Sequence, residues 1–402
     1  MSRAPILIVD YDATCAAGAG MDELRAALAA QRTGLRPNDF PGCALSTWIG
    51  RVAAIDDYAF APELAQWQSR NNALIALGLQ QGTLQQSLQR LVERFGSARI
   101  GVVMGSSTSS IDRSEEAYRQ LDNGGQLPQE FVQENVLNPH APGLFVAELL
   151  SLDGPNMTVN TACSSSAKVF ATATRWLRAG IVDAVLVGGA DTLCQSVLYG
   201  FHSLQLVSES QCRPFDGARD GINLGEAAGF ALLVRGDIAG VEHTGIQLSG
   251  YGESSDAHHM SHPHPEGAGA RLAIEQALAQ AGLVPAQIDY INLHGTASRA
   301  NDHIEGNLVG AMFPATTLAS STKGWTGHTL GAAGILESIF ALEALTSGMV
   351  PGTLNLAQVD PEIAITMGAA NQTANLTHVM SNSFGFGGNN ACLIFSRAEV
   401  AA

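Results

Sequence analysis

Short apolar runs alternate with longer alanine-rich stretches along this chain of 402 residues. The apolar runs predict buried strands, and the alanine-rich stretches predict helices. We expect strands at residues 6–9, 100–104, 184–187, 230–234, 288–293, 377–380 and 391–395. We expect helices at residues 21–31, 71–79, 166–179, 268–281 and 332–346. This alternation is typical of α/β proteins.

A boundary between two halves is expected around residues 235–245. There an apolar, glycine-rich first half ends, and a new strand begins at Ile246. No low-complexity linker interrupts the alternation of strands and helices. The sequence therefore predicts an N-terminal half over residues 1–240 and a C-terminal half over residues 241–402.

Composition narrows the class of protein. A hydrophobic content of 46% can fill one large core or two fused ones. The net charge of -16 argues against nucleic acid or an anionic membrane as the main partner. Six cysteines without paired spacing favour reduced thiols in a cytoplasm. The first ten residues are expected to form a strand rather than a signal peptide, and no membrane span is expected.

Cys163 is the strongest candidate for a reactive group. It lies in a turn of small residues, 160–167, that leads directly into a predicted helix. The free N–H groups at a helix start favour a thiolate, but they supply only about 0.3–1 kcal/mol, and at most about 2. Such an effect leaves much of the thiol protonated at neutral pH. A nearby base is therefore expected to assist, and the histidines are the first to consider.

Two histidines stand in glycine-flanked polar turns after apolar runs. His294 follows the predicted strand at 288–293, and His328 lies in the segment 320–334. An imidazole at the junction of a strand and a loop is expected to face a cleft. A glycine-rich motif at residues 381–390 precedes the last predicted strand. A phosphate-binding loop is the less favoured interpretation of this motif, because no Lys-Ser/Thr follows it.

These four segments, in this order, resemble the active-site set of the β-ketoacyl-[acyl carrier protein] synthases, the decarboxylating condensing enzymes of the thiolase fold. The resemblance covers nearly the whole chain, with further matching blocks at residues 18–28, 33–37, 212–216, 219–221, 225–226 and 254–260. It implies an α/β, thiolase-like fold of two pseudo-duplicated halves. Each half would hold a five-stranded mixed sheet covered by helices, in αβαβα layers.

The resemblance also implies a mechanism. Cys163 would accept an acyl chain as a thioester, and the enolate formed by decarboxylation of malonyl-carrier would attack that thioester. His294 and His328 would donate N–H groups to the enolate oxygen. The backbone N–H groups of Cys163 and Phe386 would hold the oxyanion on the acyl carbon. A glycine-rich turn suits this role, because it lets the backbone approach closely.

Other residues take supporting roles by the same resemblance. Lys323 precedes His328 at the family spacing, and Glu337 is its expected orienting partner. Phe386 resembles the gating aromatic residue of the family. The expected substrate-binding residues are Thr296 and Ser298, whose hydroxyls would bond the pantetheine amides, Phe201 in the acyl pocket, and Phe384.

The implied substrates are carried on the phosphopantetheine arm of an acyl carrier protein, and no other cofactor is implied. The net charge does not exclude an acidic carrier, because docking depends on a local patch. A dimer is expected, either with an identical chain or with a homologous synthase or chain-length partner. No metal site is expected. Four neighbouring histidines could suggest a metal site: His258, His259, His262 and His264. The prolines among them stiffen this segment, and no cysteine or carboxylate completes a set of metal ligands.

The chain departs from the common family pattern in three places. Arg299 stands where elongation enzymes usually have proline, and residues 63–67 are acidic or neutral where carrier-docking basic residues are usual. The block 162–168 resembles synthases of polyene or aryl-polyene clusters, several of which work with a cysteine-less partner. Two alternatives remain open: a non-catalytic chain-length partner or scaffold on this fold, and a simple cysteine acyltransferase or thioesterase.

Overall fold

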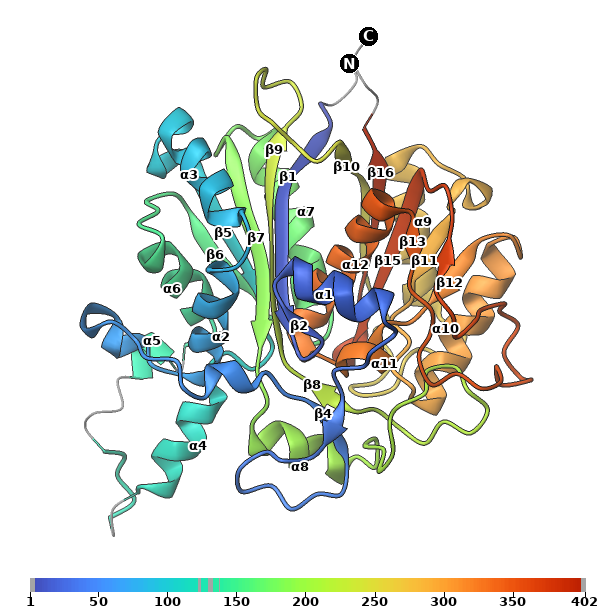
Figure 1. Cartoon of the computed structure of the whole chain (residues 1–402), viewed down its shortest axis with the longest axis horizontal. Helices are drawn as coiled ribbons and strands as arrows, with labels where there is room; N and C mark the ends of the chain where they lie inside the picture. The colour runs from blue at the N-terminus through green and yellow to red at the C-terminus, as the bar shows by residue number, and fades with distance from the viewer. Residues whose placement is uncertain (1–3, 122–123, 129–132, 137, 399–402) are drawn as a thin grey trace.

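A single twisted sheet of eleven strands runs through the molecule (Figure 1). The structure is a computed structural model that describes residues 4–121, 124–128, 133–136 and 138–398. The strand order is β12-β11-β15-β16-β10-β1-β9-β7-β5-β6, with β2 paired to β1. The bounds are β1 (Ile6–Cys15), β2 (Gly18–Ala19), β5 (Ile100–Gly105), β6 (Asn156–Val159), β7 (Ala184–Asp191), β9 (Ala227–Arg235), β10 (Ile246–Ser255), β11 (Tyr290–Asn292), β12 (Leu318–Ser320), β15 (His378–Gly385) and β16 (Asn389–Arg397).

The two ends of this sheet have the same topology. The strands of the first half, taken in chain order, are β1, β5, β6, β7 and β9, and those of the second half are β10, β11, β12, β15 and β16. In both halves the spatial order is third, second, fourth, fifth, first. The pair directions match too, because β5 is parallel to β6 and β7, as β11 is to β12 and β15. The expected α/β fold of two pseudo-duplicated five-stranded halves is therefore confirmed.

The halves meet through β1 and β10, which pair antiparallel from Ile6 to Ile8. This pairing makes one continuous sheet out of what the resemblance describes as two. The segment between β9 and β10 covers residues 236–245, which is where the sequence predicted the boundary between the two halves. The boundary between residues 240 and 241 itself stays a prediction.

Helices cover both faces of each half in five layers (Figure 1). On the outside of the first half lie α2 (Arg70–Leu79), α3 (Leu84–Phe95) and α6 (Ala141–Leu149), and on the outside of the second half lie α9 (Ala268–Ala281) and α10 (Arg299–Met312). The helices α7 (Ser165–Arg178) and α12 (Ala333–Ser347) fill the layer between the halves. Successive residues of β7 alternate between the cores, with Val185 in the central core and Leu186 in the outer one.

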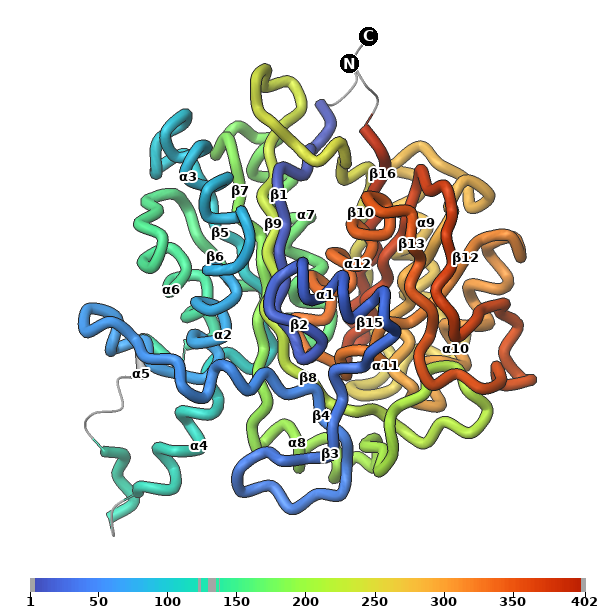
Figure 2. The backbone as a smooth tube through the Cα atoms, in the orientation of Figure 1, coloured from blue at the N-terminus to red at the C-terminus, as the bar shows by residue number. Residues whose placement is uncertain are grey.

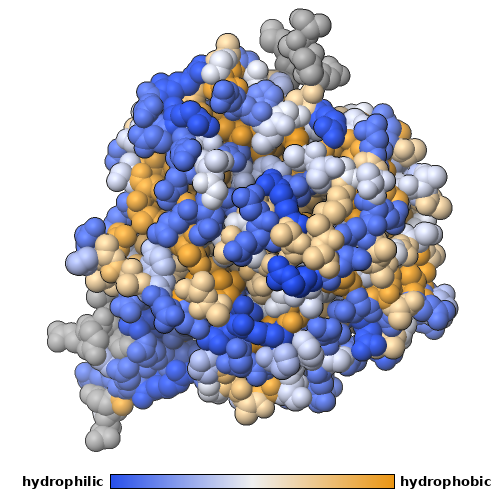
Figure 3. All heavy atoms as spheres, viewed as in Figure 1, coloured by the Kyte–Doolittle hydropathy of each residue, from blue (hydrophilic) through white to orange (hydrophobic). Residues whose placement is uncertain are grey.

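Shorter helices and strands surround the main sheet and the helices that cover it. Figure 2 shows the blue segment of β3 and β4 beside green β8 at the lower edge, and these strands form a small sheet. Hydrophilic and hydrophobic residues intermingle over the face in Figure 3. The smaller elements are α1 (Met21–Ala29), β3 (Arg36–Pro37), β4 (Trp48–Gly50), η1 (Ala53–Ile55), η2 (Pro62–Trp67), η3 (Ser97–Arg99), α4 (Ile111–Arg119), α5 (Gln133–Val136), α8 (Gln195–Ser203), β8 (Leu224–Gly225), η4 (Pro285–Gln287), α11 (Lys323–Thr326), η5 (Leu330–Ala332), β13 (Met349–Val350), β14 (Gln372–Thr373) and η6 (Phe386–Gly388).

Among the residues that the structure describes, one helical segment, Leu330–Ser347, is long and apolar enough by composition to cross a membrane. It is the segment of η5 and α12, and 89% of it is buried inside the protein. The central helix of a globular core passes the same test, because its surroundings are apolar on every side. The burial identifies this segment as a core helix.

Candidate active site

Cys163 lies in a tight turn between β6 and α7. Ala162, just before it, adopts a φ of 52°, a left-handed conformation that is uncommon for a residue other than glycine. The Ser165 hydroxyl secures the turn, since its Oγ accepts from the N–H of Thr161 at 2.9 Å and donates to the carbonyl of Ala162 at 2.6 Å. The sulfur is thus presented just before α7 by a turn that the surrounding structure holds in place.

Two glycines let the start of α7 sit directly on the sheet. A Cβ at Gly105, the last residue of β5, would lie 2.5 Å from the Cα of Ser166. A Cβ at Gly189 in β7 would lie 2.4 Å from the Cβ of Ser166. Neither distance is tolerable between carbon atoms, so this close approach requires glycine at both positions. The carboxyl ends of β5, β6 and β7 thereby meet beneath Cys163.

His328 is in direct contact with the sulfur. Its Nε2 lies 3.1 Å from Cys163 Sγ, and its Nδ1 accepts a hydrogen bond from the backbone N–H of Leu330 at 3.1 Å. A neutral ring whose Nδ1 is an acceptor carries its proton on Nε2. His328 therefore directs an N–H donor toward the sulfur.

His294 completes the group from the end of β11. Its ring centroid lies 5.4 Å from that of His328, with the rings almost perpendicular. The nearest ligand-type atoms of Cys163, His294 and His328 all lie within 4.8 Å of one another. The Nζ of Lys323 is 3.4 Å from His294 Nδ1. Because an ammonium can only donate, the proton of a neutral His294 is on Nε2 as well.

Electrostatics keeps both imidazoles neutral. Burial, reinforced by the positive charge of Lys323, holds the pKa of His294 and of His328 well below the usual range. A neutral ring can donate from Nε2 without carrying a positive charge into the buried centre. The site therefore offers two neutral N–H donors beside one sulfur.

The structure brings Lys323 and Glu337 together behind the histidines. They form a buried ion pair, with side chains 1% and 4% exposed, and Lys323 also donates to the carbonyl of His294. Burial raises the pKa of Glu337 to about 7, although the ammonium of Lys323 opposes the rise. This pair fixes both the charge near the imidazoles and the orientation of the His294 turn.

The thiol itself is protonated at neutral pH. Burial raises the pKa of Cys163 to about 11, against the lowering influence of the Lys323 charge and the N–H of Phe386. The sequence expectation that the helix start favours the thiolate is outweighed here, because α7 begins only at Ser165 and the sulfur is buried. Attack by the sulfur must therefore be accompanied by loss of its proton.

The glycine-rich motif brings the backbone N–H of Phe386 to the sulfur of Cys163. A Cβ at Gly385 would lie 3.2 Å from the backbone nitrogen of Cys163, so the two backbones run close together. Gly387 has a φ of 76°, which a residue with a side chain would rarely adopt. The ring of Phe386 stacks on Phe201 at 5.7 Å between centroids.

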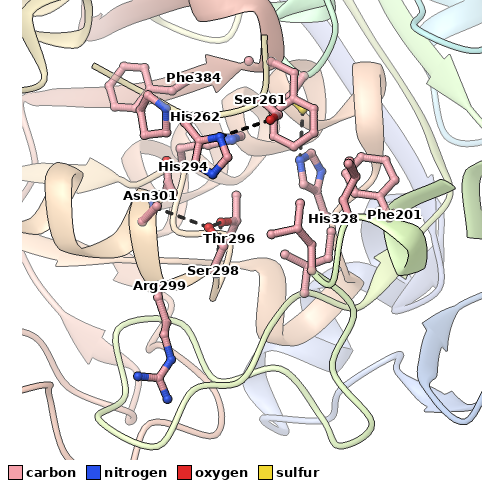
Figure 4. Close-up of a pocket in the computed structure, with 18 of the residues that line it drawn as sticks. Phe201, Ser261, His262, His294, Thr296, Ser298, Arg299, Asn301, His328 and Phe384 are labelled. Atoms are coloured by element: carbon pink, nitrogen blue, oxygen red, sulfur yellow. Dashed lines mark hydrogen bonds between the residues drawn. The ribbon is translucent and has the colours of Figure 1, made fainter. Parts of the chain in front are cut away.

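A cavity of about 370 Å³ opens onto this group (Figure 4). Eight of the ten predicted site residues line it: Cys163, Phe201, His294, Thr296, Ser298, His328, Phe384 and Phe386. The Thr296 and Ser298 hydroxyls lie 2.9 Å apart along one wall, and the Phe384 ring is 6.1 Å from the ring of His294. The remaining two predicted residues, Lys323 and Glu337, lie behind the wall.

Two buried carboxylates that the sequence did not single out hold the loops of the site. Glu305 accepts hydrogen bonds from the N–H groups of His294 and Gly295, each at 2.8 Å. Asp191, at the end of β7, accepts from the serine and threonine residues that follow β5 and from the N–H of Gly331. The signal available in the sequence was weak, because it consisted of an acid on the helix after the His294 turn and an acid at the end of a strand.

The three reactive groups are close enough to hold a metal ion, but their protons oppose it. A metal would need the Nε2 lone pairs of His294 and His328, whereas the donors at Nδ1 place protons on both Nε2 atoms. The histidine cluster at residues 258–264 forms pairs instead, with His259 and His262 joined through their Nδ1 atoms at 3.1 Å. Within the described part of the chain, these four histidines do not converge as a group of three possible ligands.

Sequence comparison identifies the same family over both halves. Residues 4–239 match the sequence model described as "Beta-ketoacyl synthase, N-terminal domain", and residues 246–357 match "Beta-ketoacyl synthase, C-terminal domain". The chain is 34% identical over 323 residues to "3-oxoacyl-[acyl-carrier-protein] synthase 2" of Vibrio cholerae, covering 76% of this chain and 78% of that protein. It is 36% identical to the mitochondrial synthase of Arabidopsis thaliana, covering 74% and 68%.

Solved structures agree with the sequence relatives. The ketosynthase ApeO in complex with its chain length factor ApeC, from Xenorhabdus doucetiae, superimposes with a TM-score of 0.85 at 37% identity, covering 98% of both chains. The ishigamide ketosynthase/chain length factor superimposes with a TM-score of 0.89 at 25% identity, covering 98% of this chain and 99% of that one.

Proposed function

The chain belongs to the β-ketoacyl synthase family, and from this premise we propose that it is a catalytically active condensing enzyme with Cys163 as its nucleophile. The observation that carries the proposal is one sulfur in contact with His328 and within 4.8 Å of His294, with both neutral imidazoles presenting N–H groups. A chain-length partner or scaffold on this fold would need no nucleophile here. A cysteine acyltransferase or thioesterase would need one histidine rather than two.

In the first step, the chain takes an acyl group from a carrier thioester. The Cys163 sulfur attacks the acyl carbonyl, and its proton leaves with the pantetheine thiol that departs. The negative charge that develops on the carbonyl oxygen is held by the backbone N–H groups of Cys163 and Phe386. The close backbone approach at Gly385 supports this pairing of donors.

In the second step, malonyl-carrier loses carbon dioxide and leaves an enolate. The Nε2–H groups of His294 and His328 stabilise the enolate oxygen, each by roughly 3 kcal/mol in a buried site. The enolate carbon attacks the Cys163 thioester, a carbon–carbon bond forms, and the sulfur is released and takes up a proton. Neutral rings suit this role, because their donors are in place before the charge develops.

Lys323 and Glu337 act as positioning residues in this scheme. Lys323 contacts His294 at Nδ1 and at the carbonyl, and Glu337 neutralises its charge. The pair therefore selects the His294 tautomer that can donate from Nε2. Neither side chain lines the cavity where substrate would bind.

We propose an acyl carrier protein as the substrate partner and a homologous synthase or chain-length chain as the dimer partner. The similarity to a ketosynthase solved with its chain length factor supports a heterodimer. Elongation of a fatty-acid-like, polyketide or aryl-polyene chain is the corresponding pathway. The phosphopantetheine arm of the carrier is the only prosthetic group in the scheme, and six free cysteines fit a cytoplasmic location.

Acyl-carrier incubated with the protein, with and without malonyl-carrier, tests the proposal. Chain extension with release of carbon dioxide is the expected result, and intact-mass analysis should show one acyl adduct that Cys163→Ala abolishes. Release of free acid alone would support a cysteine acyltransferase or thioesterase. Absence of an acyl adduct would support a non-catalytic chain-length partner or scaffold. An adduct that persists in Cys163→Ala would overturn the assignment of the nucleophile. Co-purification will show whether a homologous chain travels with this one.

A further inference from the structure

The wall of the cavity that carries His294 continues outward to an exposed arginine. Along this segment His294 and Thr296 are buried, Ser298 is half-buried and Arg299 is exposed. All four side chains line the cavity. Figure 4 shows them one after another, with the guanidinium of Arg299 at the end farthest from His294. Along this segment, each later residue therefore lies closer to the mouth of the cavity.

The backbone of Arg299 is fixed while its side chain is not. Arg219 donates to the carbonyl of Arg299 at 3.3 Å and is itself anchored by Asp360 at 2.6 Å. In the described part of the chain, no carboxylate lies within ion-pair distance of the Arg299 guanidinium. Arg219, by contrast, pairs with both Asp302 and Asp360. The free charge of Arg299 is therefore available to a ligand.

Arg299 is also the only lysine or arginine among the described residues that line the cavity. Two carboxylates also line the cavity, but both are engaged by internal donors. Asp220 accepts from Ser208 at 2.6 Å, and Asp256 accepts from Asn390 at 2.8 Å. In a protein with a net charge of -16, an anion that enters this cavity needs a local cation.

We propose that Arg299 binds the phosphate of the phosphopantetheine arm at the mouth of the cavity, an inference that rests on the proposed function. The arm has a sulfur at one end, two amides in its middle and a phosphate at its other end. The wall offers its groups in the same order: the Cys163 and imidazole centre, the hydroxyls of Thr296 and Ser298, and then a guanidinium. A guanidinium and a phosphate form charge-assisted, often bidentate hydrogen bonds.

The test compares three acyl donors with wild type and Arg299→Ala. Acyl-pantetheine has no phosphate, acyl-phosphopantetheine has one, and acyl-carrier has both the phosphate and a protein surface. Loading of Cys163 is followed by intact mass. Arg299→Ala should raise the half-saturating concentration of acyl-phosphopantetheine about 5- to 10-fold, leave the maximal rate unchanged and leave acyl-pantetheine unchanged. Arg299→Lys should recover part of the loss, since it keeps the charge but not the bidentate geometry.

Arg271→Ala is the matched control, because Arg271 is exposed on α9 and does not line the cavity. It should behave as wild type with all three donors. An equal loss with acyl-pantetheine and acyl-phosphopantetheine would overturn the proposal, as would a loss confined to acyl-carrier, which would assign Arg299 to a carboxylate of the carrier surface. If wild type loads none of the three donors, it is the proposed function that fails.

Discussion

Cys163 and His328 occupy corresponding positions in the two halves of the fold. Each follows the third strand of its half, β6 or β12, and each precedes the helix that fills the central layer, α7 or α12. The two residues are 165 positions apart in sequence, and their side chains are 3.1 Å apart. The proposed reaction centre thus lies where the equivalent loops of two similar units face each other.

Removal of either imidazole should separate the two chemical steps. We expect His294→Ala and His328→Ala to lower decarboxylation of malonyl-carrier by about 10²- to 10³-fold, because each deletes one donor to the enolate oxygen. Acyl loading should fall much less, since its oxyanion is held by backbone N–H groups. Carbon dioxide release and acyl-enzyme mass, measured on the same samples, report the two steps. Equal loss of both would contradict the assignment of these histidines to the enolate.

Alkylation of Cys163 by iodoacetamide should be slow at neutral pH and should accelerate as pH rises. The thiolate is the reactive form, and the pKa of this thiol is raised to about 11 by burial. Between pH 7 and 9 we expect the rate at Cys163 to rise about tenfold per pH unit. Peptide mass spectrometry distinguishes it from half-buried Cys43. A rate that reaches a plateau below pH 8 would show that the sulfur is ionised there.

Glu305→Gln should flatten the pH dependence of stability. Burial raises the pKa of Glu305 from 4.5 to about 7 in the folded protein, so the folded state holds a proton that the unfolded state releases. Its contribution to stability is fully present below pH 4.5 and is lost as pH rises through 7. The lost contribution amounts to roughly 3 kcal/mol.

Urea unfolding from pH 4.5 to 7.5 measures this change. The free energy of unfolding should fall less steeply with pH in Glu305→Gln than in wild type, although the variant is less stable at low pH because one acceptor for the His294 turn is lost. Glu93→Gln, at an exposed position on α3, is the control and should keep the wild-type slope. Parallel profiles for Glu305→Gln and wild type would refute the raised pKa.

Gly189→Ala should destabilise the protein and displace the nucleophile. The added Cβ would lie 2.4 Å from Ser166 Cβ and 3.0 Å from Ile335, so α7 must shift, at a cost of about 1–3 kcal/mol. Gly200→Ala in α8 is the matched control, because its Cβ would meet nothing within 4 Å and should stabilise the helix by about 0.5–1 kcal/mol. Thermal unfolding would measure the loss of stability, and acyl loading would measure the displacement of Cys163. Similar behaviour of the two variants would argue against close packing of α7 on the sheet at Gly189.

The sequence predicted the α/β class and the grouping of Cys163 with two histidines, because apolar periodicity and local motifs carry that information. It did not predict β6 and β12. These are edge strands, and the polar residues Asn156 and Thr158 interrupt the apolar pattern of β6. The sequence also did not predict the roles of Asp191 and Glu305, because each role depends on hydrogen bonds to residues in other loops of the fold. The pKa of Cys163 could not be predicted from the neighbouring residues in the sequence, because burial in the folded protein is the main cause of its shift.

Because Cys163 comes from one half and both imidazoles from the other, the proposed active site forms only where α7 and α12 pack together. The Oγ of Ser166 accepts from the N–H of Ile335 at 2.9 Å, and a Cβ at Gly334 would collide with Ala167. A fragment ending near residue 240 would keep a sulfur with no imidazole beside it, and its complement would keep imidazoles with nothing to acylate. Mixing two such fragments would restore turnover only to the extent that they re-form this helix contact, so reconstituted activity would measure how well the halves recognise each other.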